Sequence, residues 1–428
     1  MAGAQALSRP SALADRKAED TKTLILGLAL AFICGTVFVA YVVRILVGYR
    51  TGSANPFGDF FALWSYGKIA AAHSAAELYN SPLLHARQVA LGMSPAGQDP
   101  FPYPPIAIPL LLPLGRLPIP LAYLLWTIGT CGLFLWAILA TCWRSPAIVL
   151  PLLIAPTTTL NISAGQTGFL SGALLIAGMR LAATNPVVSG ILIGCLSFKP
   201  QLALLVPVAL VAAGLWRTLA TSCLTAASLA LATTLLFGWQ VWPAWLAMLP
   251  DYARMFDGAH DLLKLMPTVE ANLRLLGLTP GFAMFGQAAA ATAVATVIWR
   301  IFRRGPTAHA VAALLVGTFL CTPHALIYDA PMLSGALVSL FRARLDAGGS
   351  FTPTERLVFA VAVLFPFAMA CRGIALPVST PALVALLIVI LADAAQRPRT
   401  TPAPSRSVGN ETIITYAAPP PCPVLPKT

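Results

Sequence analysis

The sequence predicts an all-α integral membrane protein, a polytopic bundle of helices. Three observations support this fold class. Only 10% of the 428 residues are charged and 58% are hydrophobic, with a mean hydropathy of +0.79, whereas about 25% of residues are charged in a soluble domain. The apolar residues form runs separated by short turns, as expected of helices that face lipid. Excess Lys and Arg stands mainly in those turns.

The net charge of +12 raises the question of nucleic acid binding. No basic patch stands on a soluble domain, and excess Lys and Arg in a membrane protein typically marks cytoplasmic loops. We therefore expect membrane lipids among the partners and no nucleic acid. The eight cysteines lie mostly within apolar runs, without metal-ligand or CxxC spacing, so neither a zinc site nor a disulfide framework is predicted.

The first apolar run, 23–47, is too long for the core of a signal peptide and lacks a small-residue cleavage site, so we interpret it as the first span. Eleven further spans are predicted, several of them shorter than the roughly 20 residues of a perpendicular helix. They lie near 119–141, 147–163, 167–183, 187–198, 202–215, 219–237, 282–301, 308–319, 325–340, 357–370 and 377–391. The stretch 187–215 leaves open a second interpretation, one long helix broken at Lys199-Pro200.

The stretch "PYPPIAIPLLLPLGRLP", residues 102–118, is apolar but interrupted by proline. If it does not cross the membrane, the arginines of all later short turns share the side of the basic N-terminus, as the positive-inside rule requires. If this stretch crosses the membrane, the arginines of the later short turns lie on the side opposite to the basic N-terminus. We therefore expect a re-entrant or half-membrane segment here, about twelve spans in total, and both termini in the cytoplasm.

This topology divides the chain into three parts. Residues 1–22 form a cytoplasmic segment, and 23–395 form the transmembrane domain with outer loops at 48–103 and 239–281. Residues 396–428 are rich in Pro and Ser, which predicts a disordered cytoplasmic tail. Polar residues of varied chemistry gather on the outer face, whereas the cytoplasmic turns are short and basic, so we expect the functional site outside.

Asp59 stands in "NPFGDFFALWSYGK", among aromatic residues just after the first span. Asp at a helix start is a common cap, and a helix is predicted from "FFALWSYGKIAAAHSAAELY". Capping and catalysis both remain open for Asp59 on these grounds. The neighbouring aromatics are interpreted as an anchor at the membrane interface.

Lys199 stands at the end of a span on the outer face, beside Pro200. A lysine there either snorkels or serves a function, and as a point charge it suits a phosphate. His324 lies in a turn five residues before Asp329, where a structural hydrogen bond and a catalytic role are both open.

Other polar and aromatic residues of the outer face have simpler interpretations beside functional ones. Gln166 and Asn161 are expected either to bond helix ends or to contact substrate. The tryptophans Trp239, Trp242 and Trp245 are typical of an interfacial belt, as are Tyr79 and Tyr103.

Five motifs follow one another in an order typical of one family. They are "GDFFALWSYGK", "FPYPPIAIPLLLPL", "NISAGQTGFL", "GILIGCLSFKPQLALL" and "CTPHALIYDAPML". Together they resemble glycosyltransferase family 87 of the GT-C superfamily over roughly residues 55–335. The resemblance implies a GT-C fold, an extracytoplasmic active site in a bacterial inner membrane, and a polyprenyl-phosphate-linked sugar, such as mannose, as donor. It also implies that Asp59 is the essential acid and matches Gln166, Lys199 and His324 to motif positions.

Glycosyl transfer needs a base for the acceptor hydroxyl and a cation for the leaving phosphate. We expect Asp59 to be the base or to orient it, His324 to compete or assist, and Lys199 to bind phosphate. The further substrate-binding candidates are Gln166, Tyr103, Asn161 and Asp329. Single displacement inverts the anomeric carbon, the acceptor is a glycolipid or glycan, and neither a metal nor a cofactor is predicted.

Two other classes of protein remain as alternatives. A transporter or flippase of lipid-linked sugars would carry ionisable groups in the middle of its spans and often inverted repeats. A scaffold protein would not need an acid, a lysine and a histidine on one face. The gathering of ionisable groups at one interface favours the enzyme.

Overall fold

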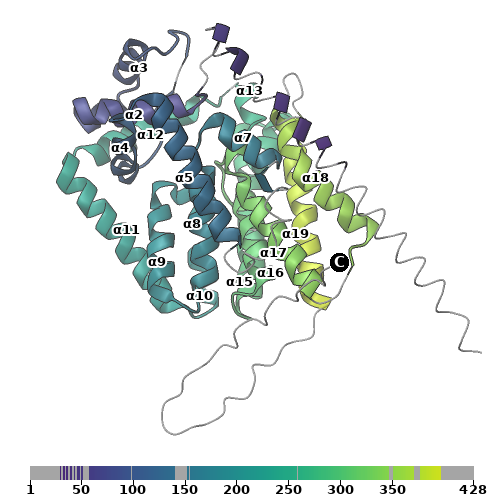
Figure 1. Cartoon of the computed structure of the whole chain (residues 1–428). Helices are drawn as coiled ribbons and strands as arrows, with labels where there is room; N and C mark the ends of the chain where they lie inside the picture. Colours follow the sequence, from purple (N-terminus) through teal and green to yellow (C-terminus); the bar gives the residue numbers. More distant parts are fainter. Residues whose placement is uncertain are drawn as a thin grey trace, which may run out of the picture.

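The computed structural model of the chain is helical throughout its regular elements (Figure 1). It describes residues 57–97, 99–139, 152–153, 155–257, 259–346, 350–370 and 376–396, with scattered residues between 29 and 51. The N-terminal segment 1–22, most of the expected first span, the start of the expected span 147–163, the turn 371–373 and nearly all of the tail lie outside these residues.

The helices form a bundle with shorter helices gathered at one end (Figure 1). The bundle consists of α5 (Ile119–Leu139), α7 (Pro156–Ala164), α8 (Gly168–Leu181), α9 (Pro186–Cys195), α10 (Val206–Ala212), α11 (Trp216–Phe237), α15 (Pro280–Phe302), α16 (Ala308–Cys321), α17 (Pro331–Asp346), α18 (Pro353–Ala370) and α19 (Ser379–Gln396). The shorter helices are α2 (Phe60–Ala72), α3 (Ser81–Ala90), α4 (Ile108–Gly115), α12 (Val241–Arg254), α13 (His260–Leu263) and α14 (Val269–Leu275). Single 3₁₀ turns η1 (Ala75–Tyr79), η2 (Pro105–Ala107), η4 (Leu196–Phe198), η5 (Pro200–Ala203) and η6 (Ile327–Asp329) connect them.

Five of the described helices are long and apolar enough to cross a membrane: α5, α11, α15, α18 and α19. Their outward faces carry exposed leucines, for example Leu224 and Leu235 on α11, as expected of surfaces that face lipid. Other expected spans are apolar helices of 10–17 residues. The chain is therefore a helical membrane protein, and the count of twelve spans stays a prediction.

The shorter helices of the bundle leave a recess near one end. Helices α8 and α16 have 14 residues each, about 21 Å, whereas α11 and α15 have 22 and 23, about 33–35 Å. Gln287, two turns into α15, donates its Nε2 to the carbonyl oxygens of Leu320 and Cys321 at 2.9 and 3.0 Å. The end of α16 therefore lies about 10 Å below the start of α15.

The stretch 187–215 forms two short arms that meet at Lys199. Gly190 and Gly194 of α9 pack against Thr221 and Thr225 of α11, in the same order along both helices. Helices α9 and α11 are therefore parallel, and the chain between them must reverse through α10. Of the two interpretations, the structure favours two short passes, with the turn at Lys199-Pro200 as their tip.

The proline-rich stretch 102–118 contributes only η2 and the eight-residue helix α4. This length is too short to cross a bilayer, as expected for a segment that does not span. Helix α4 packs on α2 at such close range that a Cβ on Gly67 would overlap the carbonyl of Leu111, and one on Gly115 would overlap the backbone of Lys68.

Arginines of the described short turns gather at the end of the bundle away from the recess. They are Arg180, Arg217, Arg300, Arg303, Arg304, Arg342, Arg344 and Arg356. The turns α8–α9 and α10–α11 meet there, because Thr218 Oγ1 donates to the carbonyl of Ala182 at 2.8 Å. This one-sided distribution agrees with the topology that the positive-inside rule predicts.

The predicted helix after Asp59 ends earlier than expected, at Ala72, and continues only as the 3₁₀ turn η1. The expectation that its aromatics anchor the chain in the membrane interface is wrong. Phe60, Trp64 and Tyr66 are buried in the protein, and Tyr66 donates its hydroxyl to the carbonyl oxygens of Asp99 and Pro100 at 3.1 and 2.7 Å. These aromatics hold α2 and the following loop together.

Candidate active site

Asp59 stands at the N-cap position of α2, yet it does not cap the helix. Its backbone is already helical, with φ −70° and ψ −10°, and its side chain makes no capping hydrogen bond. The capping interpretation of Asp59 is therefore wrong. Gln166 instead donates its Nε2 to Asp59 Oδ2 at 3.4 Å, which leaves most of the carboxylate's accepting capacity free.

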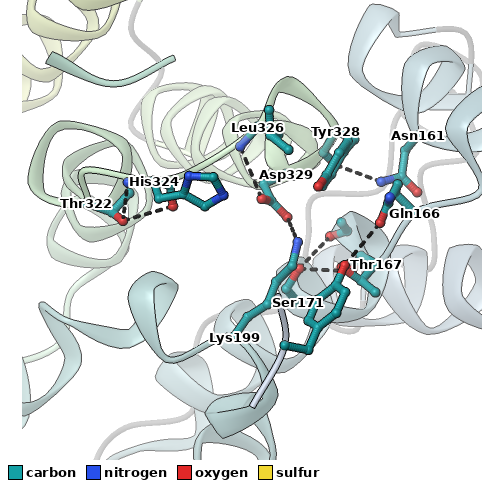
Figure 2. A network of polar contacts seen from close by, with 12 residues as sticks. Asn161, Gln166, Thr167, Ser171, Lys199, Thr322, His324, Leu326, Tyr328 and Asp329 are labelled. Atoms are coloured by element: carbon teal, nitrogen blue, oxygen red, sulfur yellow. Dashed lines mark hydrogen bonds and ion pairs between the residues drawn. The ribbon is translucent and has the colours of Figure 1, made fainter. Parts of the chain in front are cut away.

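The turn between α7 and α8 places Asn161 and Gln166. Gly165 ends α7 in the left-handed region, at φ +64°, which strongly favours glycine. Asn161 donates its Nδ2 to the carbonyl oxygen of Tyr328 at 2.6 Å, and Gln166 Oε1 accepts from the Tyr103 hydroxyl at 3.2 Å (Figure 2). The turn thereby joins α8, η6 and the loop before η2.

Gly168 lies at the tightest point of this turn. A Cβ at Gly168 would overlap the carbonyl oxygen of Tyr328 and the amide of Asn161. We expect Gly168→Ala to push η6 away from α8 and to lower both the yield of folded protein and its activity. Gly129→Ala on α5 is the matched control, since nothing lies within 4 Å of its Cβ position. Thermal unfolding in detergent measures both, and equal midpoints for the two variants would contradict the expectation.

Lys199 and Asp329 form a buried ion pair at the centre of the recess. Their Nζ and Oδ1 atoms are 2.7 Å apart, and only 4% and 3% of the two side chains is exposed. The Lys199 ammonium also lies over the rings of Tyr328 and Tyr103, 4.8 and 5.9 Å from the centroids, which stabilises the cation. Asp329 Oδ2 additionally accepts from the backbone N–H of Leu326 at 3.5 Å. Figure 2 shows the pair between η6 and the tip at Lys199.

His324 lies beside this pair, in the turn that follows α16. Its backbone is held by Thr322, whose hydroxyl donates to the His324 carbonyl at 3.1 Å and accepts from the His324 N–H at 3.2 Å (Figure 2). The ring nitrogen Nε2 is 3.1 Å from the Tyr252 hydroxyl. Burial, and then the charge of Lys199, lower the pKa of His324 to about 4, against the opposing charge of Asp329. The ring is therefore neutral at pH 7.

The pKa of Asp59 is shifted in the opposite direction. Desolvation by the surrounding protein, and then the negative charge of Asp99, raise it to about 6, while the hydrogen bond from Gln166 lowers it. Asp59 is nevertheless exposed to solvent as a whole residue. Water therefore reaches the carboxylate and limits its desolvation. A raised pKa makes this carboxylate a stronger base than an ordinary aspartate.

A cavity of about 500 Å³ fills the recess, and we call it the main cavity. Of the predicted site residues, Tyr103, Lys199, His324 and Asp329 line it. Asp59 does not line it but connects to it through Gln166 and Tyr103. Asn161 does not line the main cavity, but it holds the backbone of Tyr328, which does, through a hydrogen bond to the Tyr328 carbonyl. The structure thus brings together residues from five parts of the chain.

Several cavity-lining residues were missed by the sequence analysis. Tyr252 contacts His324, and Arg274 lines the cavity with Glu270, to which its Nη1 donates at 3.2 Å. The only signal in the sequence was their place in the outer loop 239–281. Asp257 and Asp261 of the same loop pair with Arg274 at 3.2 Å and with Lys264 at 2.6 Å, respectively.

The expected interfacial positions of several aromatic residues are also corrected. Tyr79 and Tyr103 are buried, and the Tyr79 hydroxyl donates to the carbonyl of Tyr103 at 3.0 Å. Trp245 lines the main cavity and donates to the carbonyl of Pro102 at 3.3 Å. Trp239 is exposed, as a belt residue would be. These positions are set by packing between the two outer loops, which a single sequence does not reveal.

The site therefore lies in a helical membrane bundle and combines a carboxylate, a buried lysine and a neutral histidine around a cavity, as in an enzyme that transfers a group at a membrane. Residues 101–323, more than half of the chain, match the model of glycosyltransferase family 87. The chain belongs to this family and is a membrane glycosyltransferase, so the resemblance found in the motifs is confirmed. No curated protein and no solved structure matches the chain.

The family match does not cover all of the candidate site. It contains Tyr103, Asn161, Gln166 and Lys199, and it ends one residue before His324. Asp59 and Asp329 also lie outside it. Their place in the site rests on the contacts described above. Among the described residues, no three His, Cys, Asp or Glu side chains gather as metal ligands, and independence of metal stays a prediction.

Proposed function

We propose that this protein transfers a sugar, such as mannose, from a polyprenyl-phosphate donor to a hydroxyl group of a glycolipid or glycan acceptor. The observation that carries this proposal is the composition of the main cavity. Its inner end presents Lys199 and His324, whereas Met284 and Pro280 of α15 line its side. Met284 is half-exposed on the outer surface of the bundle, between the exposed side chains of Phe282 and Phe285. A cavity that holds polar groups and is also lined by an exposed apolar residue of α15 suits a phosphate that carries an isoprenoid chain.

The reaction is a single displacement. The acceptor oxygen attacks the anomeric carbon and forms the new glycosidic bond, while the bond from that carbon to the phosphate oxygen breaks. The electron pair leaves with polyprenyl phosphate, and the acceptor proton passes to the Asp59 carboxylate. The anomeric configuration is inverted, so a β-linked donor yields an α-linked product.

The two candidate bases differ in basicity. The pKa of Asp59 is raised to about 6, and that of His324 is lowered to about 4. Both are deprotonated at pH 7, and Asp59 is the stronger base of the two. This difference favours Asp59 as the base. His324 Nε2 is hydrogen-bonded to the Tyr252 hydroxyl. In the tautomer whose Nε2 accepts this bond, the Nδ1–H is left to donate to the donor phosphate.

Lys199 has a more restricted role than a free phosphate ligand. Its ion pair with Asp329 cancels its charge within the site, so a phosphate gains less Coulomb attraction than from an unpaired lysine. The ammonium group retains two further N–H donors. We propose that Asp329 fixes the position of Lys199 and that one of these donors binds the phosphate oxygen that becomes the leaving group.

We infer that this site lies at the outer face of a bacterial inner membrane. The arginine-rich end of the bundle is assigned to the cytoplasm by the positive-inside rule. The main cavity lies at the other end, toward the periplasm. Such a site has no access to cytoplasmic nucleotide sugars, which supports a lipid-linked donor.

The identity of the donor is tested with purified protein in proteoliposomes. Polyprenyl-phosphate [³H]mannose is compared with GDP-[³H]mannose, with membrane glycolipid extract as acceptor. We expect label in the glycolipid fraction from the lipid-linked donor alone. Label from the nucleotide sugar alone, or movement of the lipid-linked donor across the bilayer without transfer, would refute the proposal, and the latter would support the flippase alternative.

The rate should depend on pH through Asp59. A base works only when deprotonated, so kcat/KM should fall as the pH drops through about 6, the pKa of Asp59. Gln166→Met removes the hydrogen bond that lowers this pKa, so the acidic limb should move to higher pH. His324 should contribute no limb between pH 5 and pH 8, since its pKa is about 4. A profile of kcat/KM from pH 4.5 to 8.5 for both proteins is the measurement, and an unmoved or lowered limb in the variant would contradict the assignment.

A further inference from the structure

A second cavity of about 380 Å³ lies between α3 and α12, on the other side of Tyr252. We call it the second cavity. Tyr252 lines both cavities, so its side chain is part of the wall between them. The volume of the second cavity falls within the roughly 300–1,000 Å³ typical of small-ligand sites.

Two buried polar atoms of the second cavity have no partner among the described residues. Gln88 is fully buried and donates its Nε2 to Ser65 Oγ at 3.1 Å, but its Oε1 accepts no hydrogen bond. The Nδ1 atom of His85, one turn earlier on α3, is also unpartnered. A buried polar group without a partner costs free energy. Both residues line the second cavity, so a ligand bound there can supply the missing hydrogen bonds after a small rotation of the two side chains.

The two cavities differ in charge. The main cavity is lined by three basic residues, Lys199, Arg254 and Arg274, whose charges are balanced by Asp257, Glu270 and Asp329. The second cavity is lined by Asp99 and by Asp251, which pairs with Arg254, and neither Lys nor Arg is among its described lining residues. A phosphate would be repelled from these carboxylates, whereas the hydroxyl groups of a neutral sugar donate to carboxylates in charge-assisted hydrogen bonds. The second cavity therefore suits an uncharged, hydroxyl-rich ligand.

Asp59 is connected to both cavities. On one side, Gln166 links it to Tyr103 in the wall of the main cavity. On the other side, Tyr66 of α2, the helix that begins after Asp59, donates its hydroxyl to the carbonyl oxygens of Asp99 and Pro100 in the wall of the second cavity, and the charge of Asp99 acts on Asp59. A base that removes a proton from one substrate during attack on the other has to stand between the two.

We propose that the second cavity binds the terminal sugar of the acceptor and presents one of its hydroxyl groups to Asp59. This inference rests on the proposed transferase function and adds to it the location and chemistry of the acceptor site. Asp99, His85 and Gln88 accept or donate hydrogen bonds to the other hydroxyls. The second cavity thereby selects acceptors whose terminal sugar is neutral, regardless of the lipid or glycan to which that sugar is attached.

The kinetic test uses octyl α-mannoside, octyl glucoside and methyl α-mannoside as acceptors, with polyprenyl-phosphate mannose as donor. Asp99→Asn should raise the acceptor KM about tenfold or more, the value of a lost charge-assisted hydrogen bond, and His85→Ala should raise it about 2- to 10-fold, the value of a neutral one. Both variants should leave the donor KM unchanged. The assay runs at pH 8, where Asp59 is ionised with or without the charge of Asp99. Glu77→Gln is the matched control, since it removes one negative charge from η1 outside both cavities.

A second measurement does not depend on turnover. Met255→Cys places a thiol in the wall of the second cavity, and Leu249→Cys places one in the main cavity. Octyl α-mannoside should protect the first thiol from maleimide and not the second, as resolved by mass spectrometry of the labelled peptides. Better protection by octyl than by methyl mannoside would indicate a lipid-linked acceptor, and equal protection would indicate a soluble glycan.

The outcomes separate this inference from the function on which it rests. Transfer by the wild-type protein, with unchanged acceptor KM in both variants and no protection of the thiol at Met255→Cys, would overturn the acceptor site alone. Absence of transfer with every acceptor and donor would overturn the proposed function. A raised donor KM in His85→Ala or Asp99→Asn would assign the second cavity to the donor and so refute the inference.

Discussion

Replacement of Asp59 by Asn should lower the rate of sugar transfer about 10²–10⁴-fold, the usual contribution of a general base. Asn has nearly the same shape as Asp, so the contact with Gln166 can persist while the amide cannot take up the acceptor proton. The Asp59 side chain makes no capping hydrogen bond, so the helix α2 should remain stable. The loss should appear in kcat, with a donor KM close to that of the wild-type protein.

The measurement is transfer of [³H]mannose in proteoliposomes that contain equal amounts of folded protein. Glu77→Gln serves as control for the loss of one negative charge from the same outer region and should retain wild-type activity. Transfer by Asp59→Asn within a few-fold of the wild-type rate, at pH 8 and with normal thermal unfolding, would exclude Asp59 as the base. His324→Ala would then be the decisive variant for the alternative.

Loss of either partner of the Lys199–Asp329 pair should destabilise the fold strongly. Lys199→Met leaves the Asp329 carboxylate buried without a counter-charge, which typically costs about 3–5 kcal/mol of the free energy of unfolding. The double variant Lys199→Met/Asp329→Leu replaces the pair with apolar side chains and should recover most of that stability. It should remain inactive, since the cationic group that binds the leaving phosphate oxygen is lost.

Thermal unfolding in detergent and the fraction of monodisperse protein measure this effect. Arg87→Met is the matched control. It breaks the ion pair between Arg87 and Glu77, which is 2.9 Å long but about one third exposed, and exposed pairs contribute about 0–1 kcal/mol. If Lys199→Met unfolds at the same temperature as Arg87→Met, the buried pair is not a structural element. If the double variant is active, Lys199 does not bind the phosphate.

The sequence predicted the helical membrane class and most of the residues that meet in the recess. Motifs near Asp59, Gln166, Lys199 and His324 identified the family, because short polar motifs between apolar runs stand out in a chain of low charge. The sequence did not reveal that Lys199 is paired, since its partner Asp329 lies 130 residues away and no local pattern links the two. It also assigned the aromatics after Asp59 to the membrane interface, because burial in protein and burial in lipid give the same apolar signal.

The number of spans was equally difficult to predict. Helices such as α8 and α16 have 14 residues each, fewer than the roughly 20 of a full span. They lie inside the bundle, where neighbouring helices replace lipid. The recess arises because these helices are short. Only the tertiary structure reveals it, since Gln287 of α15 donates to the carbonyl oxygens of Leu320 and Cys321 at the end of α16. Sequence length alone does not distinguish a short buried helix from a span with polar ends.

The sequence by itself determined the membrane environment, the helical class, the family and the identity of the candidate acid, lysine and histidine, because composition and short motifs are local properties of the chain. Only the tertiary structure decided what these groups can do. It paired Lys199 with Asp329, kept His324 neutral, raised the pKa of Asp59 and placed two cavities on either side of Tyr252. Each of these effects depends on burial and on charges brought together from distant segments, and such distances are set by the packing of the helices.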